Sequence, residues 1–248
     1  MTTAAGIVIG DEILSGKVQD TNTPLLIHRL RALGVALRRI VTVGDLPEEI
    51  AEELRRCARR FDYVFTSGGV GPTHDDRTME GVAFAFGRAV VRHPELEAMV
   101  RAHWRDRVNE AALKMAEVPD GARLLPGEPG RLRFPLVAFR NVYILPGVPQ
   151  LFAEKLAIAE RELHGERLAL HSVYLSADET EVAAQLIQVE REHPGVKVGS
   201  YPRLGVGDYR VRITFEGLTD PLVGAAVKRL LELVAPTFVV RVERGVST

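Results

Sequence analysis

Apolar residues in the first part of the chain form short runs that alternate with longer stretches of helical spacing. The short runs have the length of buried strands and lie at residues 4–9, 35–43, 63–66 and 141–145. The longer stretches predict helices at residues 24–33, 47–60, 77–86, 94–117 and 149–163. Because strands alternate with helices, we expect a three-layer α/β domain with a doubly wound, mostly parallel sheet.

The pattern changes after about residue 165. It predicts strands at residues 171–176, 196–200, 209–215 and 237–242, with helices at residues 178–192 and 221–234. The order β-α-β-β-α-β is that of a small ferredoxin-like α+β domain. We therefore place a boundary near residue 168, between a first domain of residues 1–168 and a smaller domain of residues 169–248.

Composition narrows the class of protein. The 248 residues are 46% hydrophobic and 26% charged, which is ordinary for a soluble globular protein. A formal net charge of −1 gives no support for a nucleic-acid or membrane partner. The single cysteine, Cys57, excludes an intrachain disulfide. Since we find no N-terminal leader and no long apolar stretch, we expect a cytoplasmic protein.

The most informative segment is the glycine-rich turn, residues 66–76, which reads Thr-Ser-Gly-Gly-Val-Gly-Pro-Thr-His-Asp-Asp. It joins a predicted strand to a predicted helix, where glycines allow close backbone approach and the helix start offers N–H groups to an anion. Asp75 and Asp76 stand at the same place, and acids beside a phosphate repel it unless a cation lies between them. The turn therefore predicts a nucleotide-like substrate and a divalent metal. The structural alternative is a capped helix, with Thr73 as the cap and Asp76 three residues on.

Three further segments follow predicted strands: Asp11 with Glu12, Asp45 after Gly44, and a proline-glycine turn at residues 146–149. Ligands of doubly wound sheets bind outside the carboxyl ends of the strands, so these segments should converge. Carboxylates are the usual protein ligands of magnesium. We therefore expect Asp11, Glu12 and Asp45 to join Asp76 in a metal site.

These motifs carry a family resemblance. The glycine-rich turn, residues 10–14, Asp20-Thr21-Asn22 and residues 145–149 resemble the molybdopterin-binding-domain superfamily and, within it, the N-terminal region of CinA proteins. The similarity to the molybdopterin-binding-like domain of eukaryotic FAD synthases is closer still, at residues 112–119, 134–137, 140–147 and 199–203. The resemblance covers nearly the whole chain and implies a molybdopterin-binding-like (MoCF-like) fold with a small second domain.

The resemblance implies cleavage of a phosphoanhydride, in ADP-ribose or in an FAD-like dinucleotide, with Mg, Mn or Co as the divalent metal. Carried over by position, the residues that would hold phosphate are Ser67, Gly68, Gly69, Gly71, Pro72, Thr73 and Gly147. The catalytic residues would be Asp45, Asp75 and Asp76, and the metal ligands would be Asp11, Glu12, Asp45 and Asp76. Many relatives read Thr-Gly-Gly at this turn, so we expect the additional Ser67 to reshape it.

Two other functions stay open at this point: molybdopterin binding or adenylylation in cofactor biosynthesis, and nucleotide binding without catalysis. A shared fold is weak evidence for choosing among them. The sequence shows neither the amidohydrolase domain of CinA proteins nor the adenylyltransferase domain of FAD synthases, so we expect neither nicotinamide mononucleotide deamidation nor FAD synthesis. The expected partners are a small-molecule nucleotide and further copies of the chain, as a homodimer or a trimer.

Overall fold

The computed structural model describes residues 1–127 and 134–246, and the chain divides into two units, Met1–Gly165 and Glu166–Thr248. The division lies close to the boundary that the sequence places near residue 168. The first unit has hydrophobic clusters on both sides of its sheet, and the second has a cluster of its own. Each unit is described by itself below.

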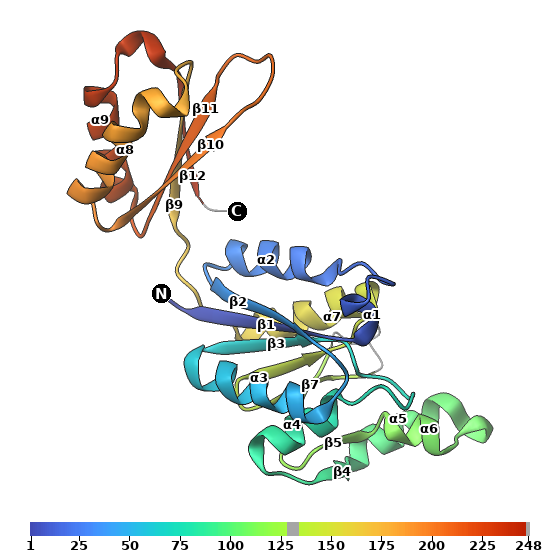
Figure 1. The fold of residues 1–248 in the computed structure, drawn as a ribbon. Helices are drawn as coiled ribbons and strands as arrows, with labels where there is room; N and C mark the ends of the chain where they lie inside the picture. Colours follow the sequence, from blue (N-terminus) through green and yellow to red (C-terminus); the bar gives the residue numbers. More distant parts are fainter. Residues whose placement is uncertain (128–133, 247–248) are drawn as a thin grey trace. The chain divides into compact units, whose positions relative to one another are not determined.

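The first unit is built on a six-stranded sheet in the order β2-β1-β3-β8-β7-β6 (Figure 1). Its strands are β1 (Thr3–Ile9), β2 (Ala36–Val43), β3 (Tyr63–Ser67), β6 (Arg123–Leu125), β7 (Leu136–Phe139) and β8 (Val142–Leu145). Strands β2, β1, β3 and β8 run parallel, whereas β7 and β6 pair antiparallel at the other end. The expected mostly parallel sheet is confirmed.

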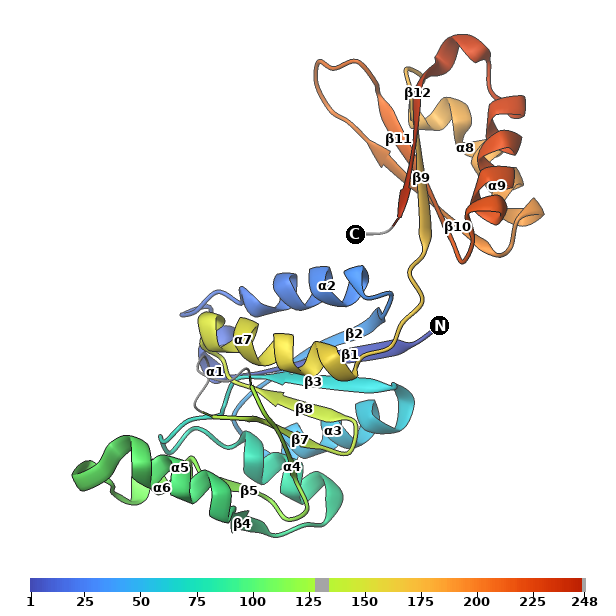
Figure 2. The ribbon, with the colours of Figure 1, turned by 180° about the vertical axis from the view of Figure 1, so that it is seen from behind.

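Helices cover both faces of this sheet, which gives the three layers that the sequence predicts. Helices α2 (Asn22–Ala32) and α7 (Pro149–Ala159) lie on one face, and α3 (Pro47–Arg60) and α4 (Thr78–Phe86) lie on the other (Figures 1 and 2). The first pair buries residues such as Leu30 and Phe152, and the second pair buries residues such as Leu54 and Val82. Two short helices complete the unit: α1 (Asp11–Leu14) follows the end of β1, and the 3₁₀ helix η2 (Glu160–Glu162) follows α7.

A small lobe beside α4 replaces the single long helix expected at residues 94–117. This side lobe consists of β4 (Val90–Arg92), α5 (Pro94–Trp104), the 3₁₀ helix η1 (Arg105–Arg107), α6 (Glu110–Lys114) and β5 (Glu117–Pro119). Helix α5 ends where Arg105 takes a positive φ of 50°. Helix α6 starts anew because the Asn109 side chain accepts a 2.8 Å hydrogen bond from the Ala112 N–H. The prediction of one helix was therefore wrong at this point.

The second unit is an antiparallel four-stranded sheet in the order β10-β11-β9-β12, with both long helices on one face (Figure 2). Its elements are β9 (Ala169–Leu175), α8 (Glu179–Glu192), β10 (Val196–Pro202), β11 (Val211–Gly217), α9 (Asp220–Leu233), the 3₁₀ helix η3 (Pro236–Phe238) and β12 (Val239–Val246). This chain order confirms the predicted ferredoxin-like β-α-β-β-α-β pattern.

Within residues 1–127 and 134–246, no helix combines the length and the apolar composition that crossing a bilayer requires.

Candidate functional site

The carboxyl ends of β1, β3 and β8 meet at one edge of the first unit, because these strands are adjacent and parallel. A cavity of about 580 Å³ lies at this edge. Its walls come from α1, the start of α2, the glycine-rich turn and the turn that leads into α7. The volume suits a ligand of nucleotide size, since small-molecule pockets span about 300–1,000 Å³.

The cavity brings together about two thirds of the predicted site residues. Those that line it are Glu12, Ser67, Gly68, Gly69, Gly71, Pro72, Asp76 and Gly147. Those that do not line it are Asp11, Asp45, Thr73 and Asp75. Two of the latter meet each other instead: the Asp45 carboxylate accepts a 3.0 Å hydrogen bond from the Asp11 N–H, at the end of the edge strand β2. The predicted acids therefore divide between the cavity wall, with Glu12 and Asp76, and positions outside it, called the rim below, with Asp11, Asp45 and Asp75.

Glycine is required at the start of the glycine-rich turn. Gly68 and Gly69 have φ angles of 109° and 62°, in the region that side chains disfavour. A Cβ on Gly68 would collide with the carbonyl oxygen of Ile9 at the end of β1. A Cβ on Gly147 would lie 3.3 Å from the Cα of Gly68. The ends of β1, β3 and β8 are thus closely packed backbone to backbone, and at Gly68 only a residue without a side chain fits.

Thr78 closes the glycine-rich turn against α4. Its hydroxyl donates a 2.8 Å hydrogen bond to the Gly68 carbonyl, and its N–H donates a 3.0 Å bond to the Gly69 carbonyl. The predicted cap was wrong: α4 begins at Thr78, and Thr73 lies within the loop. There the Thr73 N–H and hydroxyl both donate to the Asp76 carboxylate, the N–H at 2.9 Å. Loop geometry, rather than helix capping, accounts for the Thr73–Asp76 pair.

Asn22 connects the strand ends, and we did not predict a role for it. It is 5% exposed, and its amide nitrogen donates to the Ser67 hydroxyl at 2.9 Å and to the Gly147 carbonyl at 2.8 Å. A carbonyl oxygen can only accept, so the amide orientation is fixed. Among the residues that the structure describes, the Asn22 Oδ1 atom has no hydrogen-bond partner. The tripeptide Asp20-Thr21-Asn22 in the family resemblance was the available signal.

The Asp20 carboxylate fixes the backbone at Asn22. It accepts hydrogen bonds from the backbone N–H groups of Asn22, at 3.0 Å, and of Thr23, at 3.1 Å, where α2 begins. Ser67 is the last residue of β3 and is buried, so the turn proper begins at Gly68. Ser67 therefore acts as a strand-end partner of Asn22 rather than as an inserted turn residue.

The cavity wall is acidic. It carries the carboxylates of Glu12, Asp20 and Asp76, and no lysine or arginine stands among its described lining residues. Of the predicted metal ligands, Glu12 and Asp76 are the two on this wall. One oxygen of the Asp76 carboxylate accepts from Thr73, which leaves the other open to a ligand. In residues 1–127 and 134–246, no three His, Cys, Asp or Glu side chains group closely enough to hold a metal alone. Two carboxylate residues with substrate phosphates and water match the way in which Mg²⁺ is usually bound.

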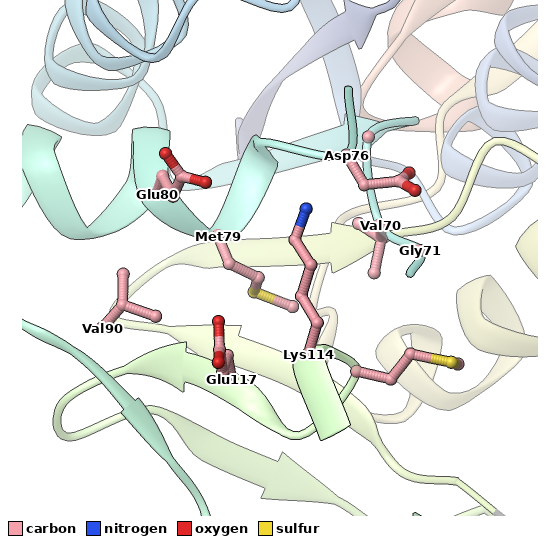
Figure 3. Close-up of a pocket in the computed structure, with 10 residues that line it drawn as sticks. Val70, Gly71, Asp76, Met79, Glu80, Val90, Lys114 and Glu117 are labelled. Atoms are coloured by element: carbon pink, nitrogen blue, oxygen red, sulfur yellow. The ribbon is translucent and has the colours of Figure 1, made fainter. Parts of the chain in front are cut away.

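A second, smaller hollow of about 60 Å³ also lies against the glycine-rich turn (Figure 3). Its lining residues are Gly69, Val70, Gly71, Asp76, Met79, Glu80, Val90, Lys114, Met115 and Glu117. Lys114 extends from the side lobe toward the segment that carries Asp76 (Figure 3). Its ammonium group donates to the Thr73 carbonyl oxygen. The side lobe therefore contributes a cation next to the acidic cavity.

Fold and site together define an α/β domain with a ligand cavity at its strand ends and an appended ferredoxin-like domain. The family model described as "Probable molybdopterin binding domain" matches residues 5–164, and the model "FAD synthase, middle domain" matches residues 167–243. The chain therefore belongs to the molybdopterin-binding-domain family, here joined to an FAD synthase middle domain.

Individual relatives agree with this assignment. A "Probable FAD synthase" of Caenorhabditis elegans is 36% identical over 94% of this chain, which spans 50% of that relative's length. A protein of Archaeoglobus fulgidus is 33% identical, with 92% of this chain and 96% of the relative covered. Among solved structures, a CinA protein "with unknown function" from Thermoplasma acidophilum has a TM-score of 0.59 and 31% identity, covering 66% of this chain and 99% of that one. The expected resemblance is confirmed.

Proposed function

We propose that this protein is a metal-dependent nucleotide pyrophosphatase that cleaves the phosphoanhydride of ADP-ribose or of an FAD-like dinucleotide. One observation carries the proposal: the glycine-rich turn and the carboxylates of Glu12 and Asp76 line the same 580 Å³ cavity. Backbone at such a turn suits phosphate, and acids beside it suit a divalent cation. Similarity to a protein named FAD synthase supports a nucleotide as the ligand.

The proposed reaction is hydrolysis. The oxygen of a water molecule bonds to one phosphorus, the bridging P–O bond breaks, and the departing phosphate leaves with the electron pair. The proton of the water passes to a carboxylate of the cavity wall. ADP-ribose would give AMP and ribose 5-phosphate, and FAD would give FMN and AMP. A bound divalent ion would supply charge stabilisation at a phosphoryl oxygen or a lowered water pKa.

Each part of the cavity has a defined task in this proposal. Glu12 and Asp76 would hold the ion, and the backbone of residues 68–71 would bind phosphate oxygens. Asn22 would keep the turns of β3 and β8 at a fixed separation through its bonds to Ser67 and Gly147. Asp11 and Asp45 lie on the rim, so we assign them no contact with the ion.

The test is to incubate the protein with Mg²⁺, Mn²⁺ or Co²⁺ and a panel of dinucleotides, and to separate the products by chromatography. We expect release of AMP that chelation with EDTA stops. Asp76→Asn should lower kcat/KM by about a hundredfold or more, whereas the rim variant Asp45→Asn should lower it less than about threefold. No AMP from any dinucleotide under any of the three metals would refute the proposal.

Molybdopterin binding is the second candidate, because the matched family model is described by that ligand. It predicts binding of molybdopterin by the same cavity without hydrolysis of ADP-ribose or FAD. Calorimetric titration with molybdopterin, next to the hydrolysis assay, separates the two functions. Tight binding of ADP-ribose without turnover would instead indicate a nucleotide-binding protein that is not an enzyme.

A further inference from the structure

Lys114 is the point where the side lobe reaches the candidate site. It is the last residue of α6, and its half-buried side chain ends at the Thr73 carbonyl within the glycine-rich turn. Of the described residues that line either the cavity or the smaller hollow, it is the only lysine or arginine. An anionic substrate would therefore meet this side chain as the one positively charged group in the two walls.

Three acids line the hollow with Lys114: Glu80 and Glu117 are paired with arginines, and Asp76 accepts hydrogen bonds from Thr73. Glu80 forms an ion pair with Arg77 at 2.7 Å, and Glu117 lies 3.5 Å from the Arg92 guanidinium. Among residues 1–127 and 134–246, Lys114 has no carboxylate within ion-pair distance, and the acceptor it does have is a neutral carbonyl. The bond to the carbonyl has one charged partner, and an anion would add the Coulomb attraction of a second charge, so an anion would be a better partner for this ammonium than the carbonyl is.

The hollow has the size of a single anionic group. A space of about 60 Å³ holds a few water molecules, or one phosphoryl group in their place, but no nucleoside. It shares Gly69, Val70, Gly71, Asp76 and Met115 with the larger cavity. A ligand can therefore extend from one into the other, with a phosphoryl group in the hollow and its remaining part in the cavity.

We propose that this hollow is a phosphoryl subsite and that Lys114, supplied by the side lobe, neutralises one phosphoryl group of the ligand there. The subsite takes a diphosphate or a phosphate monoester. Its place in catalysis rests on the proposed pyrophosphatase function, whereas its anion binding does not. In the unliganded protein the Thr73 carbonyl holds the ammonium, and on binding a phosphoryl oxygen replaces that carbonyl.

The experiment is calorimetric titration of the full chain with inorganic pyrophosphate, with and without Mg²⁺. Lys114→Met should weaken binding by about tenfold to a hundredfold, the loss expected for one hydrogen bond between charged groups. Lys114→Arg should retain most of the affinity, since it keeps the charge. Arg107→Met is the matched control: it removes an exposed cation from the same lobe that lines neither cavity. It should bind like the wild type.

A further variant separates charge from structure. Lys114→Gln keeps an N–H donor for the Thr73 carbonyl but loses the charge, so it should bind pyrophosphate as weakly as Lys114→Met. Wild-type affinity in either variant, or no pyrophosphate binding by the wild type, would overturn the subsite. If the wild type binds pyrophosphate but cleaves no dinucleotide, only the pyrophosphatase function fails. If Lys114→Met cleaves ADP-ribose with unchanged KM, the function stands and the subsite fails.

Discussion

Two kinds of strand end lie side by side in the first unit, and only one of them builds a cavity. The ends of β1, β3 and β8 are in the middle of the sheet, where Gly68 touches both Ile9 and Gly147 and where Asn22 connects Ser67 to Gly147. The end of β2 is at the sheet edge, and its acid Asp45 bonds only to the backbone of Asp11 among the contacts described above. Both ends carry motif residues, but only the middle ends have neighbours on each side that can enclose a ligand.

The difference shows that a polar residue after a strand is not sufficient to define a site. Asp45 follows the edge strand β2 and lies outside the cavity wall, whereas Glu12, after β1, and Asp76, after β3, lie on it. Asp11 also follows β1, but its N–H is bonded to Asp45, and it lies outside the wall as well. A strand end in the middle of a sheet is surrounded by two other turns, whereas an edge strand faces solvent on one side. The site therefore concentrates where backbone packing is closest, and substitutions there should have the largest effects.

The largest effect should come from Gly68→Ala. The new Cβ would meet the Ile9 carbonyl, and the φ of 109° is itself unfavourable for alanine. We expect a loss of about 3 kcal/mol or more in the free energy of unfolding. The measurement is urea unfolding followed by the fluorescence of Trp104, the single tryptophan, which lies in the first unit.

Gly16→Ala is the matched control for that substitution. Gly16 also has a positive φ, 73°, but a Cβ there would meet nothing within 4 Å. It should cost only about 1–2 kcal/mol, the ordinary penalty for a left-handed backbone. Equal losses in the two variants would show that backbone contact among the middle strand ends adds nothing beyond the φ angle.

The next largest effect should come from Asn22→Ala. It leaves the Ser67 hydroxyl and the Gly147 carbonyl without their buried donor, which costs about 2 kcal/mol in the free energy of unfolding. Asn22→Asp should be worse, because a buried carboxylate faces the Gly147 carbonyl without a proton to donate. The same urea unfolding assay checks both variants. If the aspartate variant were as stable as the wild type, the hydrogen bonds from Asn22 to Ser67 and Gly147 would not stabilise the fold as described.

A pH-dependent effect should come from Lys155 in α7, the helix that follows the end of β8. Its ammonium group donates to the Pro135 carbonyl at 2.8 Å, and burial lowers the pKa of Lys155 to about 8 from 10.5. Between these values the unfolded chain binds more protons than the folded one, so stability rises with pH. We expect about 1 kcal/mol per pH unit between pH 8 and 10.5.

Lys155→Met isolates this contribution. The difference in unfolding free energy between wild type and variant should grow in favour of the wild type across pH 8 to 10.5 and be constant below pH 8. A difference that stays flat across the whole range would mean that Lys155 titrates alike in the folded and unfolded states.

The smallest effect should come from a substitution at the end of the edge strand β2. Asp45→Ala removes one acceptor for the Asp11 N–H at the start of a four-residue helix, and we expect a change of about 0.5 kcal/mol in unfolding free energy. The same urea titration measures it. A loss as large as that of Asn22→Ala would show that the end of the edge strand β2 matters as much for stability as the ends of β1, β3 and β8. The contrast between the two kinds of strand end would then be wrong.

The sequence predicted the regular elements better than the irregular ones. The four parallel strands and the α3 helix, with Pro47 at its start and arginines at its end, follow from apolar runs and terminal charge. Strands β6 and β7 escaped prediction because they are only three and four residues long. The β7–β8 connection also lacks a glycine signal, since Arg140 takes the positive φ of 52°.

The glycine-rich turn of the candidate site was predictable from the sequence, but the residues that hold it in place were not. Three glycines and neighbouring acids mark the turn in any reading of the sequence. The hydroxyl that closes it belongs to Thr78, not to Thr73, because the loop extends to the very start of α4. Asn22 and Lys114 are far from the turn in sequence, and the residue types alone do not indicate that they contact its neighbourhood.

The sequence by itself determined the two-domain α/β architecture, the family and the position of the glycine-rich turn. These depend on local features: hydrophobic periodicity, glycine backbone freedom and the placing of charges near helix ends. Only the tertiary structure decided which acids share a wall, because that depends on the strand order β2-β1-β3-β8, which places β2 at the edge. It also brought Lys114 to the turn, since a contact across 41 residues arises from packing of the side lobe and not from any local pattern.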